Sequence, residues 1–434
     1  MPTRPRRSRD LAPSQHAAIR RQLLLIPVYI WVIYSWSITL RQLPVGTYAA
    51  DVHVARDFVH FYSQGVATRE HDAHALYDLD ALAAVVDRVV PEKVDAKFPP
   101  VYGPQVGLFF APLARLPYVP ALLTWLAVSL IGYALLVYLV WRTCLTLRRE
   151  RWTTLLLMAG APGLYFTLSF GQASLIGLGC TTALWLALRQ DRMFLAGLAV
   201  GALAYKPQFG LVAAFVFVLA GEWRVVAGAV VAIAVQAAVA LAWWDASIIP
   251  AYAGALAKLP SVVDAMEPNK ELMHSLRSFF LHLGVPQGAA LAMSAAASVA
   301  AAVAALACWR ARGDVALRYV VLLVATLLVN PHLFVYDLLL LSPALLVAWD
   351  WANRQGGHTV EPLVPAWIPA GVRALTVQQA VVALAYFCYA APLLSIALGR
   401  VPVQWSVPGL LLLGTVLVRI QLEKNASSRP GLAP

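Results

Sequence analysis

The sequence predicts an all-α integral membrane protein, a polytopic bundle of about twelve transmembrane helices with two long extracytoplasmic loops. Apolar runs of roughly 18 to 23 residues recur along the chain, which is about the length that a helix needs to cross a bilayer. Only 13% of the 434 residues are charged. The basic residues gather in short clusters between the apolar runs, a pattern typical of cytoplasmic loops.

The basic clusters orient the predicted spans. Residues 1–22 form a basic tail that we place in the cytoplasm. The apolar run from Leu23 to Leu40 is long for a signal-peptide core, so we interpret it as an uncleaved first span. Further spans are predicted at about residues 121–141, 153–168, 173–188, 193–204, 209–220, 225–243, 289–308, 316–328, 333–347, 374–398 and 403–418.

This alternation leaves two outer loops, at about residues 41–118 and 244–287, and a cytoplasmic tail at residues 423–434. Residues 23–422 then form a single membrane domain with both chain ends inside. Within the first loop, the apolar segment from Phe98 to Arg115 is interrupted by prolines, which do not suit a regular spanning helix. We expect it to form a re-entrant or interfacial segment on the outer face.

The remaining polar residues near the apolar runs all fall on the predicted outer side. Charge close to the hydrocarbon zone is costly and tends to mark function. Asp57 has the chemistry of a general base if its surroundings hold it against a hydroxyl group. The alternative is an aspartate on an amphipathic surface helix, with Phe58, Phe61 and Tyr62 facing the membrane, and Asp51 is a rival base.

Lys206 interrupts the apolar stretch "AGLAVGALAYKPQFGLVAAFVFVLA". One interpretation is a fixed cation that binds a phosphate or another anion near the membrane surface. The other is a snorkelling lysine at a helix end, with Pro207 starting the next helix.

The stretch "NPHLFVYD" provides His332, Tyr336 and Asp337 at the outer start of a predicted span. Spacing of four residues would place His332 and Tyr336 on one helix face, where the histidine is able to donate hydrogen bonds to a leaving phosphate. The alternative is a capping network in which Asn330 caps a helix that begins at Pro331.

Two further clusters lie in the outer loops. "MHSLRS" provides His274, Ser275 and Arg277, and an arginine can pair with phosphate through two hydrogen bonds, although a solvated loop explains the same pattern. "YDLD" places Asp78 and Asp80 at a spacing that some enzymes use to hold a metal. Helix capping explains this pair better, so we predict no metal site and no cofactor.

Several function classes lose their usual signatures. The net charge of +11 lies in clusters that fit cytoplasmic loops, so we predict no nucleic-acid partner. The four cysteines form no CxxC pair, and no P-loop, GxSxG, HExxH or GxGxxG motif stands in a suitable context. ATP-driven transport and metalloprotease activity are therefore disfavoured.

The order of these motifs resembles glycosyltransferase family 87 over roughly residues 20 to 350. The motifs are Asp57 with Phe58, Phe61 with Tyr62, Phe98 with Pro99 and Pro100, Phe170 with Gly171 and Gln172, Lys206 with Pro207, Pro331 with His332, and Tyr336 with Asp337. The resemblance implies a type C glycosyltransferase fold and an enzyme that uses polyprenyl-phosphate-mannose as donor for alpha-1,2-mannosyl transfer. Phe98 stands where the family commonly has tyrosine, and Met273 to Ser275 replace a more amide-rich stretch.

The resemblance implies that Asp57 is the base and that Lys206 and His332 lie near the donor phosphate, joined by Arg277. Asp51, Tyr62, Gln172, His274, Tyr336 and Asp337 are further candidates for substrate binding.

The predicted enzyme transfers a hexose with inversion to an envelope glycolipid or glycan, on the outer side of a bacterial inner membrane. Its partners are the lipid-linked donor, the acceptor and membrane lipids. The alternative is a transporter or lipid-linked sugar flippase, although we find no repeated halves.

Overall fold

The computed structural model describes residues 25–37, 55–90, 99–258, 270–355, 370–397 and 403–427. Within these ranges the chain is helical, apart from one isolated bridge between Met273 and Phe334. The prediction of an all-α membrane protein is therefore confirmed for the described residues. Seven helices among the described residues are long and apolar enough to cross a membrane.

These seven candidate spans are, by residue range, Tyr118–Trp141, Arg151–Phe170, Trp223–Trp244, Gln287–Arg310, Val335–Asn353, Val377–Ser395 and Ser406–Asn425. The corresponding continuous helices are α6 (Tyr118–Trp141), α12 (Trp223–Trp244), α16 (Gln287–Arg310), α20 (Val377–Ala397) and α21 (Ser406–Ser427). The two other spans are composite. One joins α7 (Arg151–Ala159) to α8 (Pro162–Phe170), and the other joins η5 (Val335–Leu340) to α18 (Leu341–Asn353).

Other predicted spans form apolar helices that are shorter than these seven. They are the amino-terminal helix Leu25–Ser37, α9 (Ser174–Leu188), α10 (Met193–Ala202) with η2 (Leu203–Tyr205), η3 (Pro207–Phe209) with α11 (Leu211–Leu219), and α17 (Val315–Val329). Proline residues mark some of the points where one helix ends and the next begins. Pro162 and Pro207 each occupy a first helical position, where the missing N–H group costs nothing.

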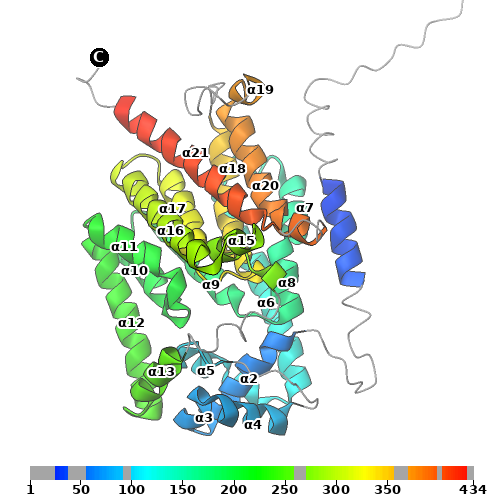
Figure 1. Ribbon diagram of the computed structural model, residues 1–434, viewed down its shortest axis with the longest axis vertical. Coiled ribbons are helices and arrows are strands. Elements are labelled where there is room, and N and C mark those ends of the chain that lie inside the picture. The colour runs from blue at the N-terminus through cyan, green and yellow to red at the C-terminus, as the bar shows by residue number, and fades with distance from the viewer. Residues whose placement is uncertain are drawn as a thin grey trace, which may run out of the picture.

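The predicted outer loops contain short helices instead of spans. The first loop forms α2 (Arg56–Arg69), α3 (Ala73–Tyr77), α4 (Leu79–Val89), α5 (Pro104–Phe110) and η1 (Leu113–Arg115). The second forms α13 (Ile248–Ala257), η4 (Lys270–Leu272) and α15 (Leu276–His282). Helices α2 to α5 gather with α13 at one end of the molecule, at the bottom of Figure 1, whereas α19 (Ala370–Arg373) and the end of α21 lie at the top.

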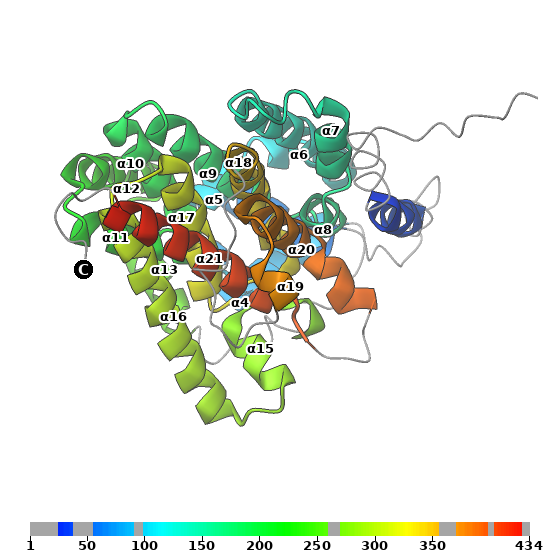
Figure 2. The same cartoon turned by 90° about the horizontal axis from the view of Figure 1, so that it is seen from above.

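Seen from above, α15 and the start of α16 project on one side of the bundle, while α6 and α7 lie on the opposite side (Figure 2). Glycine allows close packing between α10 and α12. A Cβ atom added at Gly197 would overlap the backbone of Val225, and one added at Gly201 would overlap Ala229. These two helices therefore approach each other almost backbone to backbone.

The segment around residues 99–115 does not form a spanning helix, as its prolines predict. Its two short helices pack against α2, where the rings of Phe61 and Phe110 stack with their centroids 5.0 Å apart. Phe58 and Phe61 are fully buried in the protein and Tyr62 is 5% exposed. The alternative that these aromatic residues face the membrane is therefore wrong, because the apolar side of α2 is covered by α5 and α6.

Candidate active site

Asp57 lies in the first turn of α2, where the side chain of Gln172 holds it. The Gln172 Nε2 atom donates a hydrogen bond of 2.6 Å to Asp57 Oδ2, and Gln172 Oε1 accepts one of 3.1 Å from the backbone N–H of Ala173. The second bond fixes the orientation of the amide, because only its NH₂ end is then left to face the carboxylate. Asp57 is half-buried, so part of the residue remains accessible.

Gly171 allows α2 to approach this loop. It ends α8 with a φ of 66°, in the left-handed region that glycine adopts without strain. A Cβ atom there would lie 2.8 Å from Phe58 Cβ and 3.0 Å from Ala55 Cβ. The backbone N–H of Ala55 also donates a 2.6 Å hydrogen bond to the carbonyl of Ser169. Gln172, the next residue, is thereby placed against the start of α2.

Burial raises the pKa of Asp57 to about 6, because the charged carboxylate loses solvation. The hydrogen bond from Gln172 opposes this rise, as do the positive charges of Lys206, Arg56 and His332. Asp57 is therefore mostly ionised at pH 7, with a proton affinity far higher than that of an exposed aspartate. Such a pKa suits a general base that works near neutral pH.

Lys206 and Asp337 form a buried ion pair beside this carboxylate. The Lys206 Nζ atom lies 2.7 Å and 2.8 Å from the two oxygens of Asp337, and the residues are 6% and 0% exposed. The snorkelling interpretation of Lys206 is therefore wrong, since its ammonium group points into the protein. The expectation that Pro207 starts the next helix is confirmed by η3.

Asp337 has further partners besides Lys206. Ser174 Oγ donates a hydrogen bond of 3.4 Å to Asp337 Oδ1, and the backbone N–H of Phe334 donates one of 3.3 Å to Oδ2. The ring of Tyr336 stacks on Phe334 with a centroid distance of 4.7 Å and lies 5.6 Å from Lys206 Nζ. Aromatic rings therefore form one wall beside the ion pair.

His332 lies in the turn that leads into η5, which begins only at Val335. The prediction that His332 and Tyr336 share a helix face is therefore wrong, as is the expectation that a helix begins at Pro331. Asn330 therefore caps no helix at this point, and its Oδ1 atom accepts a 3.1 Å hydrogen bond from the backbone N–H of His332 within the turn. The side chain of His332 is half-buried, and its charge acts on Asp57.

The second outer loop folds against the same segment through His274. The backbone N–H of His274 donates a 2.7 Å hydrogen bond to the carbonyl of Leu333, and its Nδ1 atom lies 2.6 Å from Ser406 Oγ. His274 and Ser275 are buried, so the interpretation of a solvated loop is wrong for them. Burial lowers the pKa of His274 to about 3, which makes the ring neutral at physiological pH.

The structure accounts for the other candidates one by one. Arg277, in α15, is half-buried and makes no ion pair with the described residues. Tyr62 donates a 2.9 Å hydrogen bond to the carbonyl of Leu116, which accounts for its hydroxyl within the fold. Asp51 lies outside the described residues. Asp78 caps α4 by accepting hydrogen bonds from the N–H groups of Asp80 and Ala81, as the capping interpretation predicts.

Tyr102 and Ser174 also belong to the site, although they are not among the residues predicted from the sequence. Burial raises the pKa of the Tyr102 phenol, as do the charges of Asp337 and Asp57, whereas a hydrogen bond with Gln172 lowers it. Tyr102 therefore lies beside both carboxylates. Its only signal in the sequence is its place in the proline-rich segment that follows Phe98.

Comparison with known proteins bears on the chemistry of this site. The sequence model of glycosyltransferase family 87 matches residues 101–343, which is more than half of the chain. This range includes Gln172, Lys206, His332 and Asp337. No curated protein and no solved structure matches the chain. The match and the apolar helices agree with the resemblance noted from the motifs. The chain therefore belongs to glycosyltransferase family 87, and this membership implies a membrane glycosyltransferase.

Proposed function

We propose that the protein transfers a hexose, with mannose as the first candidate, from a polyprenyl-phosphate sugar to a hydroxyl group of an envelope glycolipid or glycan. The reaction inverts the anomeric carbon. We place it on the extracytoplasmic face of a bacterial inner membrane, with both chain ends in the cytoplasm. Family membership supports the reaction class, and the positive-inside pattern of the basic clusters supports the side.

One observation carries the assignment of Asp57 as the base. Among the described residues, Asp57 accepts a hydrogen bond from Gln172 alone, through Oδ2, so Oδ1 keeps its lone pairs for a proton. Its pKa of about 6 leaves most molecules ionised at neutral pH. Gln172 is then a positioning residue that fixes the plane of the carboxylate, and it replaces the earlier interpretation of Gln172 as a substrate-binding residue.

In the proposed step, the acceptor oxygen attacks the anomeric carbon while Asp57 Oδ1 takes its proton. The bond between the anomeric carbon and the phosphate oxygen breaks, and its electron pair leaves with the polyprenyl phosphate. Attack and departure on opposite faces of the ring invert the configuration. A phosphate leaves readily, so it requires charge stabilisation more than protonation.

Lys206, His332 and Arg277 are the cations that we assign to the leaving phosphate. Asp337 already neutralises Lys206 in this structure, so Lys206 would share its charge between this carboxylate and the phosphate. His332 contributes from its turn, and its effect on the pKa of Asp57 supports its proximity to the reacting atoms. Tyr336 and Phe334 would limit the access of water to this side of the site.

Transfer of a labelled sugar tests the proposal. Purified protein in proteoliposomes is mixed with polyprenyl-phosphate mannose that carries a radioactive sugar and with a glycolipid extract as acceptor. We expect transfer by the natural protein and by Asp51→Asn, and a loss of about 10²- to 10⁴-fold with Asp57→Asn. Full activity of Asp57→Asn would remove Asp57 from the role of base, and loss only with Asp51→Asn would assign the role to Asp51.

A second measurement identifies the sugar and its acceptor. The masses of envelope glycans and glycolipids are compared in cells with and without the protein. If one glycan or glycolipid lacks a single hexose in cells without the protein, the missing hexose is the transferred sugar and that molecule is the acceptor. Movement of the lipid-linked sugar across vesicle membranes without any transfer would instead favour a flippase.

A further inference from the structure

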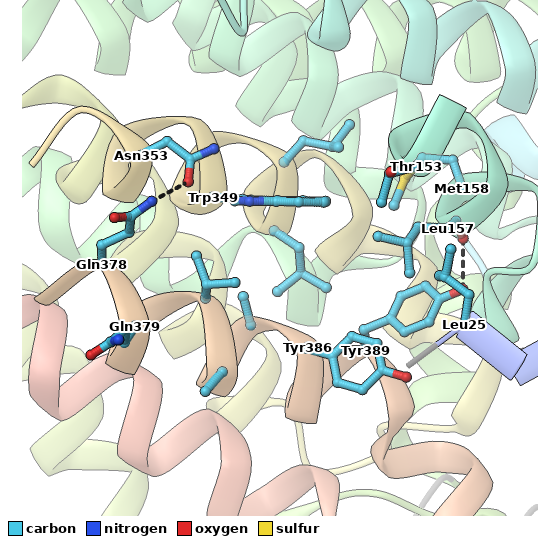
Figure 3. Close-up of a pocket in the computed structure, with 15 residues that line it drawn as sticks. Leu25, Thr153, Leu157, Met158, Trp349, Asn353, Gln378, Gln379, Tyr386 and Tyr389 are labelled. Atoms are coloured by element: carbon cyan, nitrogen blue, oxygen red, sulfur yellow. Dashed lines mark hydrogen bonds between the residues drawn. The ribbon is translucent and has the colours of Figure 1, made fainter. Parts of the chain in front are cut away.

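An apolar pocket of about 580 Å³ lies in the bundle, lined by α7, α18 and α20 together with Leu25 of the amino-terminal helix. Its walls are formed by side chains such as Leu157, Met158, Trp349 and Tyr386, and Figure 3 shows them turned toward the pocket from several helices. The volume falls within the range of sites that bind a small molecule.

One end of the pocket is polar. Gln378 Nε2 donates a 3.0 Å hydrogen bond to Asn353 Oδ1, and Gln379 lies at the same border (Figure 3). Asn353 ends α18, and Gln378 and Gln379 lie at the start of α20. The candidate active site, by contrast, lies where α8 ends and where η5 begins. The pocket and its polar rim therefore occupy the part of these spans away from Asp57 and Asp337.

Basic residues surround the polar end. Arg354 is exposed directly after Asn353, and Lys424 Nζ donates a 2.8 Å hydrogen bond to Gln355, two residues after Asn353. Asp350, one turn before Arg354, is largely neutralised because it is buried, accepts hydrogen bonds from Thr146 and pairs with Arg354. This end of the pocket therefore favours an anionic head group.

We propose that the pocket binds an acyl chain of an anionic phospholipid from the leaflet opposite the candidate active site. Three candidate membrane spans form the walls, so hydrocarbon chains have direct access to them. An apolar cavity excludes water and favours an apolar chain. Basic sites between spans on the cytoplasmic side bind lipid head groups. The amides of Gln378 and Gln379 would contact the glycerol ester region.

This lipid site is separate from the proposed transfer reaction and does not depend on it. Leu25 and Tyr389 both line the pocket, and Tyr389 donates a 2.6 Å hydrogen bond to the carbonyl of Leu157. A bound chain would therefore contact the amino-terminal helix and the bundle together. We expect it to add to the thermal stability of the protein.

Photolabelling of the full-length natural protein tests the proposal. The protein is delipidated in detergent and placed in nanodiscs of phosphatidylcholine with phosphatidylglycerol that carries a diazirine on one acyl chain. After irradiation, mass spectrometry locates the label. We expect it on peptides of α7, α18 and α20, with competition by unlabelled phosphatidylglycerol and not by additional phosphatidylcholine.

Substitution of a buried wall residue gives a second test. Ala385→Phe places a ring in the pocket, and Ala237→Phe makes the same change on an exposed position of α12. We expect Ala385→Phe to reduce phospholipid retained in native mass spectrometry by at least about tenfold, since several buried methylene contacts are lost. Ala237→Phe should retain the natural amount.

Three results would overturn the proposal. The first is a photolabel that is distributed evenly over lipid-exposed helices such as α12. The second is equal competition by phosphatidylcholine, which would show that the head group is not selected. The third is stronger competition by polyprenyl phosphate, which would assign the pocket to that lipid. Because labelling uses the natural protein, these results are decisive even if Ala385→Phe fails to fold.

Discussion

Asp57 and Asp337 lie in the same candidate site, but their surroundings hold them in opposite ways. A neutral amide, that of Gln172, holds Asp57, whose carboxylate is half-buried and keeps one oxygen without a hydrogen bond from the described residues. A lysine holds Asp337, and both of its oxygens are occupied by Lys206 in a fully buried pair. The first arrangement leaves a charge available for proton transfer, whereas the second uses the charge to hold elements of the bundle together.

Replacing each aspartate by asparagine should distinguish the two roles. We expect these two substitutions to have the largest effects of those considered. We expect Asp57→Asn to lose about 10²- to 10⁴-fold in sugar transfer and to keep the fold. Because the pKa of Asp57 is raised from 3.8 to about 6 in the folded state, its ionisation opposes folding, and this cost builds up between about pH 4 and pH 6 and is complete at pH 7.5. The melting temperature of Asp57→Asn should therefore be equal to or above that of the natural protein at pH 7.5, as measured by thermal denaturation in detergent.

Asp337→Asn should behave in the opposite way, since it leaves the buried ammonium group of Lys206 without a counter-charge. Loss of one partner of a buried ion pair costs about 3–5 kcal/mol in the free energy of unfolding. Thermal denaturation at pH 7.5 should thus show a marked loss for Asp337→Asn. An unchanged melting temperature would contradict a structural role for the pair.

Replacing both partners tests whether Lys206 has a second role. Lys206→Met alone leaves Asp337 buried and unpaired, with a similar cost of about 3–5 kcal/mol. The double variant Lys206→Met with Asp337→Leu removes both charges and should recover most of the stability. We expect sugar transfer to stay low in the double variant, because the cation for the phosphate is missing. Recovery of transfer would show that Lys206 acts only through the fold.

Gly171→Ala tests the contact between α8 and α2. The left-handed backbone of Gly171 costs an alanine about 1–2 kcal/mol, and the new Cβ atom would meet Phe58 and Ala55. We expect a small loss of stability and a larger loss of transfer, because Gln172 would move away from Asp57. Gly254→Ala, in α13, is the control, since no atom lies within 4 Å of its added Cβ. Equal effects of the two changes would contradict this account.

The positions of the helices could be predicted from the sequence, because long apolar runs between basic clusters leave few alternatives. Their lengths and breaks could not. The runs around α10 and α11 are short, and the turn at Lys206 is stabilised by Asp337, which lies 131 residues away. A local sequence pattern does not identify a partner at such a separation.

The polar candidate residues could also be predicted from the sequence, because a charged residue near an apolar run is easily recognised. Their partners were missed for a physical reason. The aromatic side of α2 has the same pattern whether lipid or protein covers it, and here α5 and α6 cover it. Tyr102 is an ordinary residue in a proline-rich segment, and only the fold brings it beside Asp57 and Asp337.

The pH dependence of sugar transfer tests the central claim, that Asp57 is the working base, most directly. With a pKa of about 6, the rate should fall as the pH drops below 6, by about tenfold per unit, because the protonated carboxyl accepts no proton. Gln172→Leu removes the hydrogen bond that lowers this pKa. We expect the acidic limb of kcat/KM to move to higher pH in Gln172→Leu, whereas an identical limb in both proteins would show that Asp57 is not the base.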